Sequence, residues 1–259
     1  MAENPLAYEN ISKLLKGFAI PSITATLVSS LYNIVDQIFI GQGVGYLGNA
    51  ATNVCYPLST ICLAISLLLG IGSAARFSPY LGKKEPEHAA RLVGNGIVLM
   101  VGARFLYHIC GELFLTPLLR VFGATEEVLP FARQYAGVVL LGMPFLILTN
   151  GISNLIRADG SPRYSMLCMV AGAIVNTILD PIFIFLLDWD VFGAALATIL
   201  SQFVGGVIPL VYFLRPNSSK LRLGRTAFHG RALLKACANG SSEFMTNISM
   251  SVVNMLYNW

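Results

Sequence analysis

The sequence predicts an all-α integral membrane protein, and three observations lead to that fold class. Hydrophobic residues make up 55% of the 259 residues, and charged residues only 12%. Soluble domains carry about 25% charged residues, so this chain has half the usual charge. Apolar segments close to the roughly 20 residues of a spanning helix recur along the chain. Stretches such as AISLLLGIGSAA are apolar at consecutive positions, which excludes the alternation of a spanning β-barrel.

Seven segments are long and apolar enough to be considered as spans. We place them at 14–40, 50–75, 92–118, 133–156, 164–187, 192–214 and 232–259. The connections between them are short and rich in turn-forming residues, so none is long enough for a soluble domain. We predict a six-helix transmembrane lobe within residues 1–230. Residues 231–259 are expected to start a second lobe as a truncated seventh helix.

Lys and Arg residues concentrate in alternate loops, which predicts the orientation of the chain. Fourteen of the 17 lie in the N-terminal segment and in the second, fourth and sixth loops. The opposite loops hold only Arg120 and Arg133. Because loops rich in Lys and Arg stay cytoplasmic, we expect a multi-pass protein of the cell membrane with a cytoplasmic N-terminus. The net charge of +4 reflects this orientation, so it gives no reason to expect nucleic acid as a partner. The expected partner is the lipid bilayer.

Three polar residues from three spans are predicted to lie at one depth. Asp36 comes five residues before Gly41 at the outer end of the first span, and Asp180 comes eight residues before Asp188 in an outer loop. Thr198 follows the same loop on the next span. At a rise of about 1.5 Å per residue, all three lie roughly 7 to 12 Å below the outer surface.

The local spacing brings further oxygen atoms to this level. Asn176 and Asp180 are four residues apart and share a helix face, as do Tyr32 and Asp36. The proline after Asp180 cannot donate a hydrogen bond, so the carbonyl of Thr177 is left free. Oxygen donors of this kind suit a small hard cation, and a carboxylate among them could instead hold a proton. We therefore expect a proton or a sodium ion at this site.

A purely structural role for the two acids is the alternative. An Asp at the centre of a span costs about 2.5 to 3.5 kcal/mol on insertion scales, so two such residues favour a functional role. Arg104, His108 and Glu112 also follow a spacing of four, on the third span. For these we expect a self-neutralising stripe in which His108 bridges the other two, and a functional relay is the alternative.

Four segments carry a resemblance to a known family: LYNIVDQIFIG, RADGSPR, NTILDPIFIF and GAALATILSQ. They resemble the multidrug and toxic compound extrusion (MATE) family, and the similarity runs the whole length of the chain. The resemblance implies two six-helix lobes that expel cationic, often aromatic compounds in exchange for protons or sodium. It implies a cation site formed by Asp36, Asn176, Asp180, Ala194 and Thr198, with Na⁺ held at Asp36, Asn176, Asp180 and Thr198. It also implies polar residues of the lobe's inner cavity at Tyr32, Tyr135 and Asn150.

The expected function is therefore a cation-coupled antiporter, driven by H⁺ or Na⁺, that exports organic small molecules. It is not expected to be an enzyme or to need a cofactor. Two features depart from the family pattern: the charged stripe at Arg104, His108 and Glu112, and a length that supplies only one lobe. Two explanations are expected for the missing lobe. Either this chain is incomplete, or a second copy of the chain takes the place of the second lobe.

Three other functions are alternatives to the antiporter. A lipid-linked sugar flippase of the same superfamily would be expected to line its cavity with several arginines, but only Arg104 lies within a span. An intramembrane aspartyl protease would carry its second acid in Gly-x-Gly-Asp, whereas the contexts here are NIVDQ and TILDP. A non-transporting membrane scaffold remains an alternative if the acids prove indifferent to mutation.

Overall fold

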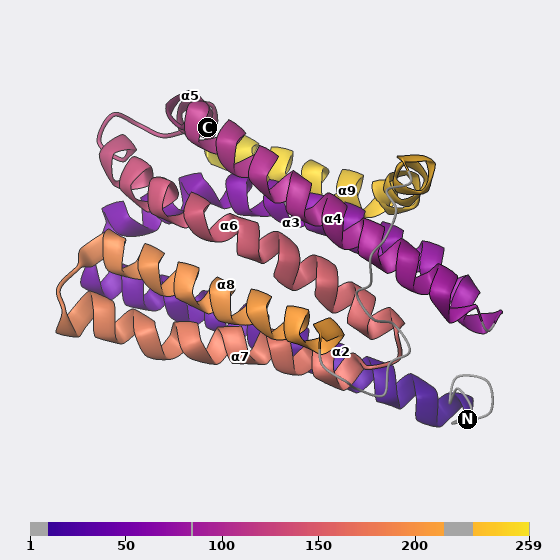
Figure 1. Cartoon of the computed structure of the whole chain (residues 1–259). Coiled ribbons are helices and arrows are strands. Elements are labelled where there is room, and N and C mark those ends of the chain that lie inside the picture. The colour runs from indigo at the N-terminus through magenta and orange to yellow at the C-terminus, as the bar shows by residue number, and fades with distance from the viewer. Residues whose placement is uncertain (1–9, 84, 215–229, 259) are drawn as a thin grey trace.

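The computed structural model describes residues 10–83, 85–214 and 230–258, and these are helical almost throughout (Figure 1). The first half of the chain contains α2 (Ile11–Gly43), α3 (Tyr46–Gly82), α4 (Pro86–Leu113) and α5 (Leu115–Val121). The second half contains α6 (Leu129–Ala158), α7 (Pro162–Pro181), the π-helical turn η1 (Ile182–Leu186), α8 (Asp190–Leu214) and α9 (Gly230–Asn258). The all-α prediction is confirmed for the described residues.

Six helices of the described residues are long and apolar enough to cross a membrane. They are α2, α3, α4, α6, α7 together with η1, and α8. Each corresponds to one of the first six predicted spans. The predicted seventh span is the helix α9, but it is not among the six, since it carries polar residues such as Asn239, Glu243 and Asn247. Of the basic positions used for orientation, Lys84 and those at 215–225 lie outside the described residues.

Helix α6 forms the centre of the bundle. It packs against α3 and α4 on one side and against α7 and α8 on the other, as Figure 1 shows. Large side chains of α6, including Met143, Ile147 and Ile152, are almost completely buried. Helix α2 lies at the edge and contacts mainly α7, so most of its surface is exposed. The core therefore forms around α6, and α2 is held chiefly by α7.

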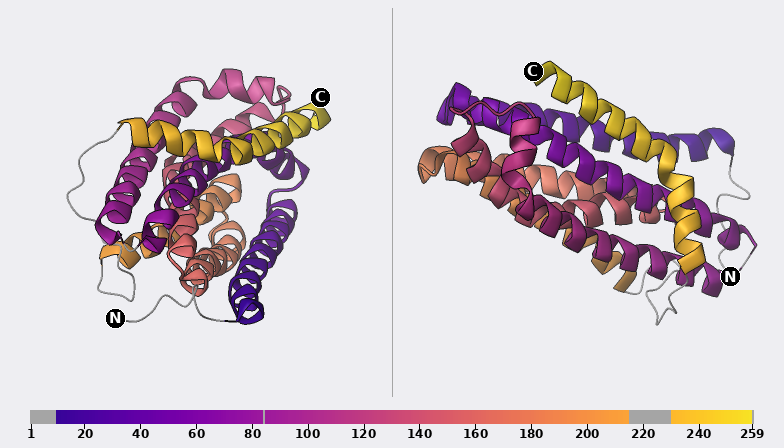
Figure 2. Two further views of the ribbon diagram at one scale, coloured as in Figure 1. Left: turned by 90° about the vertical axis from the view of Figure 1, so that its right-hand side faces the viewer. Right: turned by 90° about the horizontal axis from the view of Figure 1, so that it is seen from above.

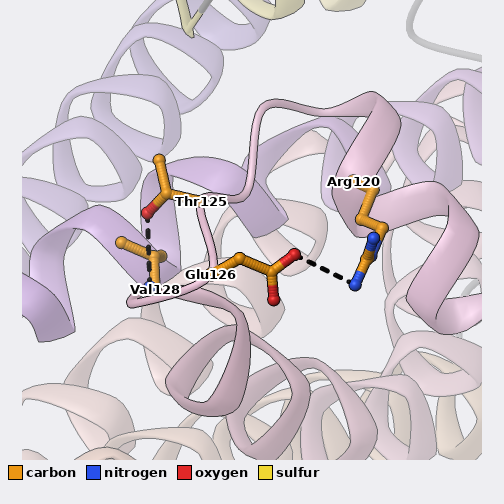
Figure 3. Close-up of polar contacts among 4 residues, drawn as sticks. All are labelled: Arg120, Thr125, Glu126 and Val128. Carbon is orange, nitrogen blue, oxygen red and sulfur yellow. Dashed lines mark hydrogen bonds and ion pairs between the residues drawn. The ribbon is translucent and has the colours of Figure 1, made fainter.

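The loops after α2, α5 and α7 gather at one end of the bundle, as the predicted topology requires (Figure 1). The loop between α5 and α6 is held by an ion pair of 3.1 Å between Arg120 and Glu126 (Figure 3). In the same loop the Val128 amide donates to Thr125 Oγ1 at 3.4 Å. In the predicted topology this end is the outer side.

The predicted third span, 92–118, is wrong at its outer end. Helix α4 ends at Leu113, and α5 begins as a separate short helix at Leu115. Pro117 explains the break, because its ring would clash with the carbonyl of Leu113 if one helix continued through both. The residue between the helices, Phe114, has non-helical backbone angles, with φ −110° and ψ 16°.

Helix α9 lies on α3, on the side of the bundle opposite α7 and α8 (Figure 2). Two glycines bring the backbones together. A Cβ at Gly72 of α3 would clash with the backbone of Ala236, and a Cβ at Gly240 of α9 would clash with the backbone of Leu68. Because both obstacles are backbone atoms, neither can move aside as a flexible side chain would.

The glycine contact between α3 and α9 can be tested by Gly240→Ala. We expect this change to lower stability by about 1–3 kcal/mol, because the methyl group overpacks the interface. The matched control is Gly102→Ala, since a Cβ at Gly102 in α4 meets nothing within 4 Å. That control should be neutral or stabilising, because Ala is the better helix former by about 1 kcal/mol. Thermal unfolding in detergent measures both, and equal effects would contradict the close approach.

Candidate functional site

Helix α7 supplies two side chains of the site from adjacent turns. Asp180 is fully buried and Asn176 is 2% exposed, whereas Ile178 between them faces outward. The Asn176 Nδ2 group donates to Asp180 Oδ1 at 3.2 Å. The predicted sharing of one face by Asn176 and Asp180 is therefore observed, with the amide bound to the acid.

Helix α2 brings the second carboxylate. It buries only four residues, Pro21, Ala25, Asp36 and Ile40, so an acid is one of the few side chains that it turns inward. Asp36 faces α7, and its carboxyl group is near enough to that of Asp180 for the two to interact directly. Two adjacent negative charges away from water repel each other strongly, so a proton or cation between them would relieve the repulsion.

Three oxygen atoms at this site accept no hydrogen bond from the described residues. They are Asp36 Oδ1, Asn176 Oδ1 and Asp180 Oδ2, and all three are buried. Buried acceptors are normally paired, so these oxygens need an explanation. Carboxylate and amide oxygens are ligands of hard cations, and soft metals prefer sulfur and nitrogen. The donor set therefore fits Na⁺, or a proton held by one carboxyl group.

Helix α8 contributes Ala194, which packs on α2 and η1, and Thr198, which lies near Tyr135. Ala194 is fully buried and packs with Ile40 of α2 and Ile184 of η1, so its small side chain lets the three elements meet. The Thr198 hydroxyl donates to the carbonyl of Ala194 at 3.0 Å. Because its proton is used in this way, the Thr198 oxygen is left as an acceptor. No hydrogen bond to either aspartate is found for it within the described chain.

The two predicted tyrosines, Tyr32 and Tyr135, lie near the same site. Tyr32 lies one turn before Asp36, and its electrostatic neighbours include both Asp36 and Asp180. Tyr135 of α6 has the same two acids among its neighbours, and its hydroxyl lies beside Thr198. The structure thus brings both tyrosines to the carboxylates.

Asn150, also predicted for the cavity, is not brought to this cluster. It lies on α6 fifteen residues beyond Tyr135, which is about 22 Å along the helix. Its side chain donates to the carbonyl of Leu146 at 3.2 Å. A role for Asn150 elsewhere in the cavity stays a prediction.

The sequence analysis missed Gln37 and Thr52. The Gln37 Nε2 group lies 3.5 Å from Asp36 Oδ2, and the Thr52 hydroxyl donates to Gln37 Oε1 at 3.1 Å. Gln37 was visible as a polar residue next to an acid inside an apolar span. Its link to Thr52 joins two helices and could not be read from spacing within one.

The charged stripe on α4 is not the bridge that we expected. His108 pairs through Nδ1 with the carbonyl of Leu140, at 3.1 Å. The Arg104 guanidinium lies 4.7 Å from the ring centre of Phe105 and 5.4 Å from that of Phe145. Glu112 is exposed, and no ion pair connects the three within the described residues. The neighbouring helix α6 thus provides the contacts that we had assigned to the stripe itself.

Six apolar helices around two facing, buried carboxylates define a polytopic membrane protein with an intramembrane acidic site, which is a common mark of ion pathways. Residues 21–182 match the MatE family model, and the chain belongs to this family. It is 30% identical to a multidrug export protein, MepA, of Staphylococcus saprophyticus, over 100% of this chain and 58% of that protein. The chain thus spans little more than half the length of the curated relatives it matches.

Two solved structures show the same arrangement of helices. A MATE multidrug transporter, DinF-BH, is 31% identical, with a TM-score of 0.92 over 99% of this chain and 58% of that one. A MOP superfamily transporter from Pyrococcus furiosus is 26% identical, with a TM-score of 0.88 over 96% and 55%. That transporter is reported to have a binding pocket of reverse polarity, which suggests a different function for it. These relatives are transporters and export proteins.

The repulsion between the two acids can be tested by Asp180→Asn. In alkaline buffer without Na⁺ the variant should melt at a higher temperature than the parent, by about 2–4 °C for each kcal/mol of repulsion relieved. Adding Na⁺ or acid should raise the melting temperature of the parent but not of the variant. Glu127→Gln, at an exposed acid of the outer loop, is the control and should retain the parent's response. A variant that still responds to both additions would show that the pair does not hold the cation.

Proposed function

We propose that residues 1–230 form the first lobe of a cation-coupled antiporter that exports organic compounds, cationic or aromatic, across the cytoplasmic membrane. The observation that carries this proposal is the pair formed by Asp36 and Asp180, with three buried oxygens that accept no hydrogen bond from the described residues. Binding of H⁺ or Na⁺ there would change the charge of the lobe interior. An antiporter needs such a site, because the ion must favour a different conformation from the one that the substrate favours.

The proposed ligands are Asp36, Asn176, Asp180 and Thr198, and Ala194 provides space for α8 to approach. Tyr32 and Tyr135 would line the path between this site and the inner cavity of the lobe. Aromatic faces attract organic cations, so these tyrosines also suit the proposed substrate class. The coupling ion is H⁺ or Na⁺, and no cofactor takes part.

A second lobe is part of the proposal, since alternating access uses two bundles that rock about a shared site. The lobe would come either from further chain beyond α9 or from a second copy. Helix α9 supports a partner on its free side, because Asn239, Ser242, Glu243 and Thr246 are exposed there. Uphill transport by the 259-residue chain reconstituted alone would favour two copies.

The sugar flippase is less well supported than the antiporter. A site for an anionic lipid phosphate needs basic groups, but the buried charges of this lobe are acidic. Arg104 contacts the rings of Phe105 on its own helix and Phe145 on α6. We find no observation that favours the scaffold.

The proposed orientation predicts labelling from opposite sides of the membrane. In a Cys110→Ser background, which removes an exposed thiol, Glu87→Cys should react with an impermeant thiol reagent only from the cytoplasm. Glu127→Cys should react only from outside, and both positions are exposed in the structure. Reaction of Glu127→Cys from the cytoplasm would overturn both the orientation and the depth assigned to the acids.

The antiport function predicts that Asp36→Asn and Asp180→Asn abolish cation-driven efflux in the complete transporter. Asparagine keeps the size and hydrogen bonding of aspartate but removes the charge that takes up the ion. Thr198→Ala should reduce efflux only about two- to tenfold, as one neutral hydrogen bond is worth about 0.5–1.5 kcal/mol. Efflux of ethidium from cells measures all three, with membrane insertion checked by immunoblot and Glu127→Gln as control. Full efflux in both Asp variants would reduce these residues to a structural role.

A further inference from the structure

A shallow, open cavity of about 660 Å³ lies at the surface between the outer part of α2 and the start of α3. Four of its lining side chains are amides, those of Asn33, Gln37, Gln42 and Asn49, and none is charged. Amides within apolar helices are costly unless they are hydrogen-bonded, and a polar ligand or water can supply such bonds. The cavity borders on the cation site, because Gln37 belongs to both.

Asn49 is placed in the cavity by a close contact with α2. A Cβ at Gly41 would come within 2.6 Å of Asn49 Nδ2, so the Asn49 amide packs directly on the backbone of α2. Asn49 Oδ1 is buried and accepts no hydrogen bond from the described residues. An unpaired amide oxygen therefore lies just beneath the wall of the cavity.

Gln37 connects this wall with the buried carboxylate. Its amide nitrogen lies 3.5 Å from Asp36 Oδ2, which is long for a hydrogen bond and therefore weak. Its oxygen accepts from the Thr52 hydroxyl, which also lies 2.9 Å from the carbonyl of Asn49. A hydroxyl has one proton for two acceptors. When the Thr52 proton turns to Asn49, the Gln37 oxygen becomes free.

We infer that this cavity is the outer access chamber of the cation site, and that Gln37 is the ligand that passes the ion between the chamber and Asp36. This inference rests on the proposed antiport function. Neutral amide oxygens can replace part of the hydration shell of Na⁺, or order water for a proton. Because they carry no charge, they lower the barrier to entry without trapping the ion.

The test is Gln37→Leu in the complete transporter, with the ion varied on one side of the membrane at a time. We expect the outside Na⁺ or H⁺ concentration for half-maximal exchange to rise about tenfold or more, as a hydrogen-bonding group next to a charge is lost. The dependence on the inside concentration should not change. In one arm the Na⁺ concentration is varied at fixed pH, and in the other the pH is varied without Na⁺. Comparing the two arms distinguishes Na⁺ from H⁺.

Two variants separate ion transfer from a structural role. Gln37→Glu restores an oxygen ligand and should return the outside half-maximal concentration to the parent value or below it. Asn33→Leu removes an amide from the same cavity, but this amide donates to the Ser29 carbonyl at 2.7 Å, so its effect should be much smaller. If Gln37→Leu changes both sides equally and Gln37→Glu does not rescue it, Gln37 is only a tie between α2 and α3, and the inference is wrong.

A labelling experiment covers the case in which Gln37→Leu does not fold. In the Cys110→Ser background, Gln37→Cys should react with an impermeant thiol reagent from outside and should then block exchange. Failure to react from outside would show that the cavity is not an outer access chamber. Loss of efflux in Asp36→Asn together with normal outside dependence in Gln37→Leu would overturn this inference alone. Full efflux in Asp36→Asn would instead overturn the proposed function.

Discussion

The approach of two carboxylates inside the membrane is the constraint on which the rest of this structure depends. Asp36 and Asp180 come from α2 and α7, and both are withdrawn from the surface of the lobe. Their charges repel, and each would be costly to bury alone. The surrounding helices must therefore hold the acids together and also provide oxygen ligands for whatever neutralises them. Asn176 meets part of this requirement by donating to Asp180.

The placement of the helices follows from that requirement. Helix α6 contributes more buried apolar side chains than any other helix, so the core depends little on α2. Helix α2 buries few side chains and contacts mainly α7, which leaves it the most loosely held of the six spans. A site shared with a loosely held helix can respond to its occupant. Neutralising the acids would allow α2 to settle against α7, and leaving both charged would weaken that contact.

The outer end of α7 shows how one proline shapes the site. Pro181 has no N–H group, and the chain continues as the π-helical turn η1. The next loop is tight, with left-handed backbone at Asp188 and Asp190, at φ 55° and 46°. Aspartate tolerates this conformation better than most residues. The turn and the loop return the chain as α8 beside α7, which places Ala194 next to Ile40 and Ile184.

The sequence by itself determined the features that depend on composition or on geometry within one helix. Low charge and long apolar segments predicted an all-helical membrane protein, and the six main spans correspond to observed helices. A period of 3.6 residues was enough to place Asn176 and Asp180 on one face, because that geometry is the same in any helix. The break after Leu113 was also encoded locally, by Pro117, but its effect was overlooked.

The tertiary structure alone decided which groups from different helices meet. Equal depth suggested that Asp36 could approach Asp180, but the packing of α2 on α7 brings them together. The same packing placed Gln37 between Asp36 and Thr52, gave His108 a carbonyl of α6 in place of Glu112, and left Asn150 about four turns from Tyr135. The physical reason is that positions along one helix follow a fixed rise and rotation. Contacts between helices depend instead on side-chain volumes and close glycine approaches that involve residues far apart in the sequence.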